Sequence, residues 1–285
     1  MNPFLEVLTR MMPPSDEMPV IPEIKVPESH MEYLQWQCDN YNKTAVASKD
    51  GIDCPECLNR GHISVIKDDV IVLRECQCMI TRRGFLKMEA AGFGKIAEKY
   101  TFDRYVTREE WQKRAKEKAM KYVRENPDKW LFFGGQSGCG KTHLCTAVCM
   151  ELMNQRHDVL YVLWRDLVHY MEQNRFKGEN YNAKIWELQD IEVLYIDDFL
   201  KTTCKDQYGK LKPSEMELNT AYEIVNSRVI TGKKTIISSE LHINDISVLD
   251  EATGGRISEA SENWQIMLNY DKTRNFRFYG KESCL

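Results

Sequence analysis

Residues 132–144, FFGGQSGCGKTHL, carry the strongest indication of the fold of this chain. It contains Gly135-x4-Gly140-Lys141-Thr142, the spacing of a phosphate-binding loop, in which backbone N–H groups surround phosphates, a lysine reaches the terminal phosphates and a hydroxyl ligates Mg²⁺. The run KWLFF before it predicts a buried strand, and KTHLCTAVCMELMNQ after it has helical spacing without Gly or Pro. This context favours a true phosphate-binding loop over a chance glycine turn.

Three further apolar runs extend this unit into a sheet. DVLYVLW, EVLYIDD and KTIISSE, at 158–164, 192–198 and 234–240, read as strands separated by helical stretches from Asp166 and from Ser214 to Val229. The alternation predicts an α/β fold with a parallel sheet, helices on both faces and the ligand at the carboxyl ends of the strands. The second run ends in Asp197 and Asp198, which could hold Mg²⁺ and orient an attacking water. Hydrolysis of a nucleoside triphosphate is therefore favoured over binding alone.

The bulk composition is that of a globular protein. The 285 residues are 42% hydrophobic and 29% charged, which suits one large domain or two small ones. No apolar run approaches the roughly 18 residues that a membrane helix needs, and the N-terminus lacks the pattern of a signal peptide. We therefore expect a cytoplasmic protein without a membrane partner. Because the net charge is −4, contacts with nucleic acid would have to come from local basic patches.

The cysteines indicate a metal site. Ten cysteines without a secretion signal argue for thiols that ligate metal rather than for disulfides. The pairs in CPEC and CQC flank residues 58–75, which read as a hairpin with its turn at KDD, and they predict a four-thiolate Zn²⁺ site at Cys54, Cys57, Cys76 and Cys78. The second pair has one intervening residue, so Cys38 or His62 is an alternative ligand. A redox-active CxxC is the other reading, but it normally lies in a βαβ context that is missing from this pattern.

Two more helices are predicted outside these motifs. Asn2 and Pro3 begin a short apolar helix before a proline-rich stretch within 1–30; it could dock in a partner's groove, pack on its own domain or be disordered. Thr107 and Glu110 form a capping box that begins a basic amphipathic helix. Its basic face either is only solvated or binds a nucleic-acid phosphate backbone together with Arg82, Arg83 and Lys87. The residues of this face are Lys113, Arg114, Lys116, Lys118, Lys121 and Arg124.

Several segments together resemble a known family. GGQSGCGKTHLCTAV, VLYIDDF, KPSEMELNTAYEIVNSRV, TIISSEL, GGRISEAS and DKTRNFR, preceded by CPEC and CQC, resemble the DnaC/DnaI-type replicative helicase loaders over residues 50–280. These are AAA+ ATPases similar to the IstB-type transposition helpers. The resemblance implies an AAA+ P-loop core at 101–285, a zinc-binding helicase-interaction module at 31–100, and a helix with its tether at 1–30. The sequence ends soon after RNFRFYG, so no separate helical lid is expected.

The resemblance also implies roles for single residues. ATP and Mg²⁺ are the expected cofactors; Thr142 and Asp197 would hold the magnesium, and Lys141, Asp197 and Asp198 would be catalytic. Arg256 would complete the site of a neighbouring subunit, so a homo-oligomer is expected in the ATP-bound state. Where the family usually has a polar Asn, this chain has Glu240 after Ser239, and either could fill the sensor position. The residues expected around the nucleotide are Gly135, Gly138, Cys139, Gly140, Lys141, Thr142 and His143.

The function that this resemblance implies is ATP-dependent loading of the hexameric replicative helicase onto single-stranded DNA. Three alternatives remain beside it. A transposition helper shares the ATPase core but commonly lacks the cysteine module, and a P-loop kinase with a zinc lid would have its motifs in the reverse order. A zinc-binding adaptor that uses ATP only structurally would be distinguished by the absence of ATP turnover.

Overall fold

The computed structural model of the protein describes residues 27, 29–48, 53–90, 94, 99–202, 204 and 212–279. The chain divides into two compact units. The first contains the described residues up to Ala47 together with Asp53–Glu75, and the second contains Ser48, Cys76 and the described residues that follow Cys76. The module expected at 31–100 is thus divided between the two units. The helix expected near Asn2 lies outside the described residues. Within the described ranges, no helix has the length and apolar character needed to span a membrane.

The second unit is built on a five-stranded sheet in which every neighbouring pair is parallel. The strand order is β4-β5-β6-β3-β7, so the strand before the phosphate-binding loop lies inside the sheet, between β6 and the edge strand β7. All residues of β3 and β5 are buried, as expected for a sheet covered on both faces. The predicted α/β fold with a parallel sheet is confirmed. The strands are β3 Leu131–Gly135, β4 Val159–Leu163, β5 Val193–Asp197, β6 Lys234–Ser239 and β7 Gln265–Leu268.

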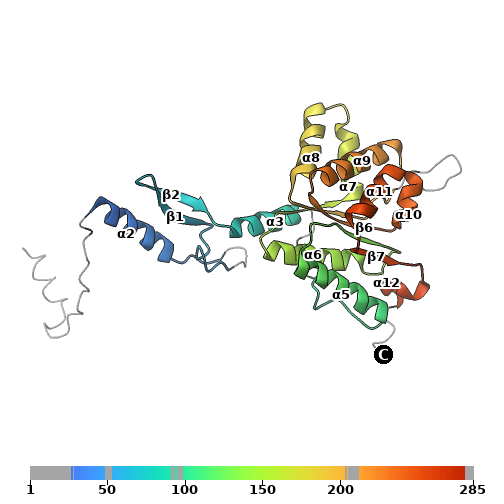
Figure 1. Ribbon diagram of the computed structural model, residues 1–285, viewed down its shortest axis with the longest axis horizontal. Coiled ribbons are helices and arrows are strands. Elements are labelled where there is room, and N and C mark those ends of the chain that lie inside the picture. The colour runs from blue at the N-terminus through green and yellow to red at the C-terminus, as the bar shows by residue number, and fades with distance from the viewer. Residues whose placement is uncertain are drawn as a thin grey trace, which may run out of the picture. The chain divides into compact units, whose positions relative to one another are not determined.

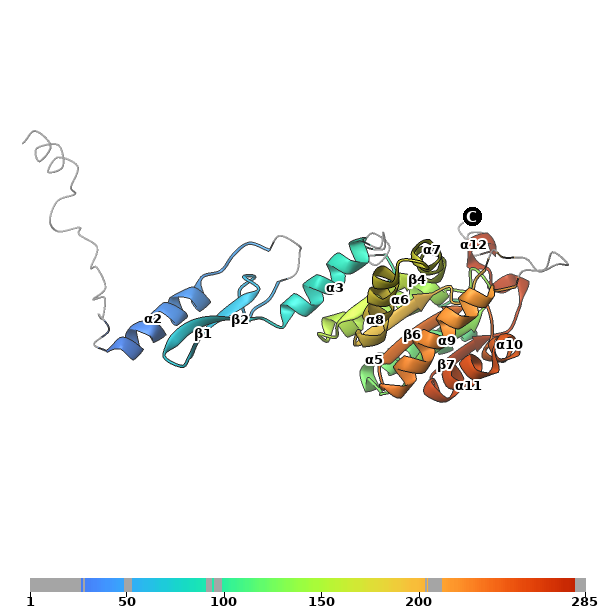
Figure 2. The same cartoon turned by 90° about the horizontal axis from the view of Figure 1, so that it is seen from above.

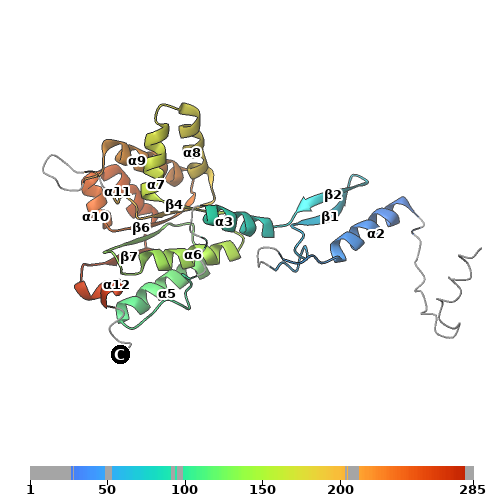
Figure 3. The same ribbon diagram turned by 180° about the vertical axis from the view of Figure 1, so that it is seen from behind.

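Helices cover both faces of this sheet (Figures 1 and 3). On one face lie α5 Glu110–Glu125 and α6 Lys141–Asn154, and α3 Cys78–Ala90 packs against α6 and β4. On the other face α9 packs against both α8 and α11 (Figure 2). The helices of this second face are α7 Trp164–Asn174, α8 Gly178–Asp190, α9 Glu215–Ile230, α10 Ile243–Leu249 and α11 Glu251–Ala260. Two short turns of helix follow β7, namely η2 Lys272–Arg274 and α12 Phe276–Tyr279.

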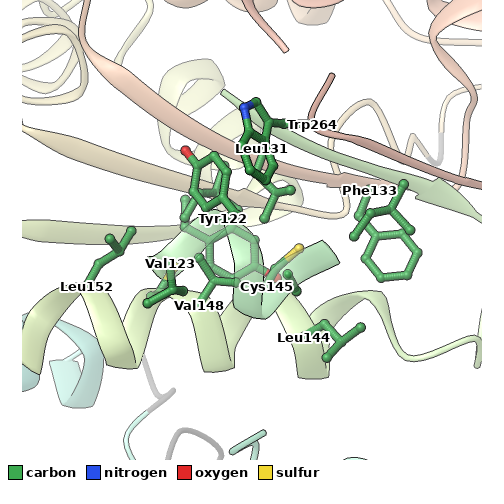
Figure 4. Close-up of a cluster of buried hydrophobic side chains, with 14 of the residues drawn as sticks. Tyr122, Val123, Leu131, Phe133, Leu144, Cys145, Val148, Leu152 and Trp264 are labelled. Carbon is green, nitrogen blue, oxygen red and sulfur yellow. The ribbon is translucent and has the colours of Figure 1, made fainter. Parts of the chain in front are cut away.

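The core has two layers because successive side chains of a strand point to opposite faces. Leu131 and Phe133 of β3 join the cluster under α5 and α6, whereas Phe132 joins the cluster under the helices of the other face. Figure 4 shows the first cluster, in which the ring of Tyr122 meets that of Trp264 edge-on at 5.3 Å between centroids. This packing holds α6, and therefore the phosphate-binding loop at its start, rigidly on the sheet.

Arg228 of α9 is fully buried. It joins three elements at the end of the sheet opposite the phosphate-binding loop. Its guanidinium donates to the carbonyls of Leu188 (2.7 Å) and Ile191 (2.9 Å) and to the Thr235 hydroxyl (2.9 Å). Burial lowers the pKa of Arg228 to about 9, so the group stays charged at neutral pH. A charged donor with these acceptors fixes the end of α8 against the beginnings of β5 and β6.

The first unit is a helix on a hairpin. In it, α2 His30–Lys43 packs on β1 His62–Lys67, which pairs antiparallel with β2 Val70–Glu75. The Asn42 side chain donates to the carbonyl of Ser64 (2.9 Å) and accepts from its N–H (2.8 Å), which fixes the helix in register. The hairpin turns at Asp68 and Asp69, both with positive φ, at the predicted KDD position.

One predicted helix start was wrong. The basic helix α5 begins at Glu110 with Glu109 as N-cap, rather than at a Thr107–Glu110 box. The Gln112 side chain accepts hydrogen bonds from the N–H groups of Arg108 (2.7 Å) and Glu109 (2.9 Å), so a glutamine three residues on makes the cap. Part of the basic face is paired within the helix, because Arg114 contacts Glu110 (3.3 Å).

Candidate functional site

The phosphate-binding loop runs from the end of β3 to the start of α6. Gly138 and Gly140 have φ of 80° and 90°, a backbone conformation that favours glycine. A Cβ on Gly138 would lie 2.1 Å from Asn275 Oδ1, and one on Gly140 would lie 2.8 Å from the ring of Tyr105. Gly140 is the N-cap of α6 and provides no side-chain hydrogen bond, so N–H groups of the first helical turn face the loop. Such groups and the helix dipole form an anion-binding site.

The P-loop side chains meet the end of β5. Lys141 is buried, and its ammonium donates to the carbonyl of Gln136 (3.0 Å) inside the loop. The Thr142 hydroxyl donates to Asp197 Oδ1 at 3.1 Å. Two oxygen ligands of the kind that Mg²⁺ prefers are therefore adjacent beside the loop, and the pair fits a magnesium ion.

Asp197 is buried and held by hydroxyl groups from its own strand and from both neighbouring strands. Tyr195 donates to its Oδ1 (2.9 Å), Tyr161 donates to its Oδ2 (3.4 Å), and Ser238 of β6 also donates to Oδ1. Burial, and then the charge of Asp197, raise the pKa of both tyrosines, so their hydroxyls remain protonated donors. Sequence reasoning missed these tyrosines, although both lie in quoted strands with the residue alternation that points them to one face.

The second carboxylate lies in a different environment. Asp198 has φ of 54°, and its Oδ2 accepts from Lys201 Nζ at 3.0 Å. The same ammonium donates to Glu240 Oε1 at 2.9 Å. Burial alone would lower the pKa of Lys201, but the hydrogen bonds to Glu240 and Asp198 outweigh it and raise the pKa above its usual value.

The two sensor candidates differ in position. The Ser239 side chain is fully buried, donating to the carbonyl of Phe199 (2.7 Å) and accepting from Leu241 N–H (3.1 Å). Glu240 instead lines the cavity beside the phosphate-binding loop. Ser239 thus serves the backbone of the 198–201 loop, and Glu240 is the residue that a ligand in the cavity would meet.

A cavity of about 290 Å³ opens over the loop. Its lining includes an aromatic wall formed by Tyr100, Tyr105 and Trp111. The His143 ring stacks on Tyr100 at 4.8 Å and meets Tyr105 edge-on, and burial lowers the pKa of His143. The buried Tyr105 hydroxyl makes no hydrogen bond within the described residues. The predicted residues that line this cavity are Gly138, Cys139, Gly140, Lys141, Thr142, His143, Asp198 and Glu240.

Arg256 lies outside the lining of this cavity. It is on α11, where its Nε donates to Asn226 Oδ1 (2.9 Å) and its guanidinium lies 5.1 Å from the centre of the Tyr222 ring. Nearer the loop, Arg277 of α12 lines the cavity, and Arg274 lies over the Trp111 ring at 5.7 Å. Both C-terminal arginines lie in short helical turns.

The four predicted cysteines lie together near the hairpin. Their sulfur atoms lie within 4.8 Å of one another and all four residues are buried. Gly61 N–H donates to Cys57 Sγ at 3.3 Å. Cys38 instead accepts from the Ser64 hydroxyl (3.2 Å) and is not part of the cluster. The set of donors and their spacing fit a tetrahedral zinc ion.

Comparisons with known proteins place the second unit in a family. The bacterial DnaA ATPase domain matches residues 96–260. The chain is 27% identical to YqaM of Bacillus subtilis (strain 168) over 70% of its own length and 64% of YqaM, so it spans just under two thirds of that relative. It is 26% identical to the replicative helicase loader DnaC of Escherichia coli (strain K12) over 213 residues, which are 73% of this chain and 81% of DnaC.

The fold of a solved relative agrees with this match. A crystal structure of the DnaC helicase loader superposes with a TM-score of 0.51 at 21% identity, covering 61% of this chain and 99% of that one. The region that the bacterial DnaA ATPase domain matches, residues 96–260, contains the phosphate-binding loop and the carboxylates at the end of β5. The chain therefore belongs to the family of the bacterial DnaA ATPase domain, within the AAA+ class of nucleotide-binding proteins.

Proposed function

We propose that this protein is an ATP-hydrolysing loader that delivers the hexameric replicative helicase to single-stranded DNA during the initiation of replication. The observation that carries the ATPase part is the contact between Thr142 and Asp197 at the mouth of a phosphate-binding loop with Lys141 buried inside it. The likeness to the replicative helicase loader DnaC supports the loading part.

In this proposal each residue of the loop has a defined task. The N–H groups at the start of α6 bind the phosphates, and Lys141 exchanges its contact with the Gln136 carbonyl for the terminal phosphates. Thr142 and Asp197 would hold Mg²⁺, which neutralises charge that develops on the phosphates. Asp198 orients the attacking water. The aromatic wall at Tyr100 and Tyr105 takes the base.

Arg256 acts in this proposal on the site of a neighbouring subunit. Its contacts with Asn226 and Tyr222 hold the guanidinium on the surface formed by α9 and α11, away from the cavity of its own chain. An arginine that stabilises the transition state from a neighbour is worth about 10³ to 10⁵ in rate. The ATP-bound protein is therefore a homo-oligomer.

The cysteine cluster binds a structural zinc ion in the same proposal. The zinc holds the ends of the hairpin, and the first unit with its zinc contacts the helicase.

A transposition helper shares the ATPase core, but the likeness to DnaC over 81% of that protein favours helicase loading.

The first test is ATP turnover by the full chain with Mg²⁺. The wild type should release phosphate. Lys141→Ala should reduce turnover at least about a hundredfold, because the variant lacks the ammonium that stabilises the negative charge of the transition state. Lys233→Met is the matched control. Lys233 directly precedes β6, forms an ion pair with Asp190, and does not line the cavity. Tight ATP binding without turnover by the wild type would point instead to an adaptor that uses ATP structurally.

A further inference from the structure

Lys201 connects two carboxylates that line the nucleotide cavity. Its ammonium lies 3.0 Å from Asp198 Oδ2 and 2.9 Å from Glu240 Oε1, and all three residues line the cavity beside Lys141 and Thr142. The three side chains are 44%, 27% and 34% exposed, so a ligand entering the cavity can reach them. This cluster joins the end of β5 to the end of β6.

The backbone fixes this arrangement. Lys201 N–H donates to the Asp198 carbonyl (3.0 Å), which closes a tight turn after β5. Phe199 N–H donates to the Ser238 carbonyl (2.8 Å), and the Ser239 hydroxyl donates back to Phe199 (2.7 Å). The turn that carries Lys201 is thus anchored to the strand that carries Glu240, so the ion pair is built by the fold and not by two unconstrained surface side chains.

The carboxylates create an electrostatic problem for a triphosphate. Asp197, Asp198 and Glu240 place three acidic groups at the strand ends that face the phosphate-binding loop. The terminal phosphate of a nucleoside triphosphate would add further negative charge within the same cavity. Like charges this close repel one another; solvent screens part of this repulsion, and a cation held between the groups reduces it further.

We propose that Lys201 is a positioning residue that lets the cavity accept the γ-phosphate, because it neutralises Glu240 and holds the Asp198 carboxylate in place. The proposal rests on the proposed ATP-dependent function. The effect of Lys201 should be specific for triphosphates, because a diphosphate lacks the γ-phosphate whose charge adds to that of the carboxylates. Lys201 and Glu240 then act as one unit. Removing both charges should weaken triphosphate binding less than removing the lysine alone, which leaves the Glu240 carboxylate uncompensated.

A double-mutant cycle tests this unit. Dissociation constants for ATPγS and ADP are measured by calorimetry on the full chain with Mg²⁺, using the wild type, Lys201→Met, Glu240→Gln and the double variant. Lys201→Met should weaken ATPγS binding about tenfold, an effect moderated by solvent, and change ADP binding less than about twofold. The double variant should regain ATPγS affinity to within about threefold of the wild type, since the uncompensated carboxylate has gone.

The outcomes separate this inference from the proposed function. Equal losses for ATPγS and ADP, or a double variant as weak as Lys201→Met, would overturn the neutralising role of Lys201. Lys233→Met, which removes a lysine paired with Asp190 at the opposite end of the sheet, should leave both affinities unchanged. A wild type that binds neither nucleotide would overturn the ATP-dependent function, and the role of Lys201 with it. Normal ATP turnover with an unaffected Lys201→Met would overturn only the role of Lys201.

Discussion

At the scale of single residues, Asp197 is positioned before any ligand arrives. Its carboxylate accepts hydrogen bonds from Thr142, Tyr195 and Ser238, which come from α6, β5 and β6. The raised pKa values of the tyrosines keep their hydroxyls as donors across the physiological range. A carboxylate fixed in this way needs little reorganisation to hold a cation, which is the condition for efficient electrostatic catalysis.

Glu192 provides a residue-scale prediction about pH. Burial raises its pKa, but the hydrogen bonds from His157 and from the N–H of Asp158 outweigh burial and lower the pKa below 4.5. Because the folded protein binds this proton less readily than the unfolded chain, Glu192 stabilises the fold above pH 4.5 and ceases to do so as pH falls through the lowered pKa. The side chain is half exposed, so solvent screening limits the contribution to about 1 kcal/mol.

The measurement is the free energy of unfolding of Glu192→Gln by urea at several pH values. The variant should be less stable than the wild type at pH 7, and the difference should disappear well below pH 4.5. Asp190→Asn, which alters a carboxylate that is 93% exposed, is the control and should show a much smaller difference. A deficit of Glu192→Gln that is independent of pH would mean that the residue acts through packing.

At the scale of elements, the hairpin is too small to bury a core of its own. Residues on β2 are half-buried or exposed along its whole length, and α2 is joined to the hairpin by hydrogen bonds between Asn42 and Ser64. A four-thiolate zinc site could contribute roughly 10 kcal/mol to folding such a unit. The closely spaced sulfurs of the four buried cysteines make this the expected source of its stability.

Zinc removal tests this element directly. The purified chain should contain about one zinc ion per molecule, as four thiolates form one tetrahedral site. A strong chelator should make the amides of β1 and β2 exchange hydrogen rapidly. Cys57→Ser should lose the zinc, whereas Cys38→Ser should keep it, because Cys38 bonds to Ser64 outside the cluster. Unchanged exchange after complete removal of the metal would contradict a structural role.

The elements differ in how far the sequence predicts them. Strands β3 to β6 and helix α6 lie within a few residues of their expected places, because buried parallel strands are continuous apolar runs. The run at β7 is only four residues long and α8 begins at a glycine, so neither has a clear periodic signal. The pairing of Lys201 with Glu240 depends on strand order, which brings the ends of β5 and β6 together, and no local pattern predicts it.

At the scale of the whole molecule, the proposed oligomer makes Arg256 of one subunit part of its neighbour's site. Arg256→Ala should therefore lower ATP turnover about 10³-fold or more while leaving ATP affinity nearly unchanged. Mixing Arg256→Ala with Lys141→Ala should restore part of the turnover, because some interfaces then combine an intact loop with an intact arginine.

The mixing experiment is measured as phosphate release at constant total protein. The control is a mixture of Lys141→Ala with the Lys141→Ala/Arg256→Ala double variant. No subunit in this mixture has an intact phosphate-binding loop, so the mixture should stay inactive. Turnover of the first mixture equal to the sum of its parts would contradict a role for Arg256 between subunits.

In the proposed function, ATP turnover by this protein places a hexameric helicase on DNA. This is tested by measuring the amount of cognate replicative helicase that stays, after gel filtration, on circular single-stranded DNA coated with single-strand-binding protein. Helicase should be retained when the wild-type chain and ATP are both present, and retention should fall to background with Lys141→Ala. Equal retention without the chain, or with Lys141→Ala in its place, would rule out ATP-dependent helicase loading by this protein.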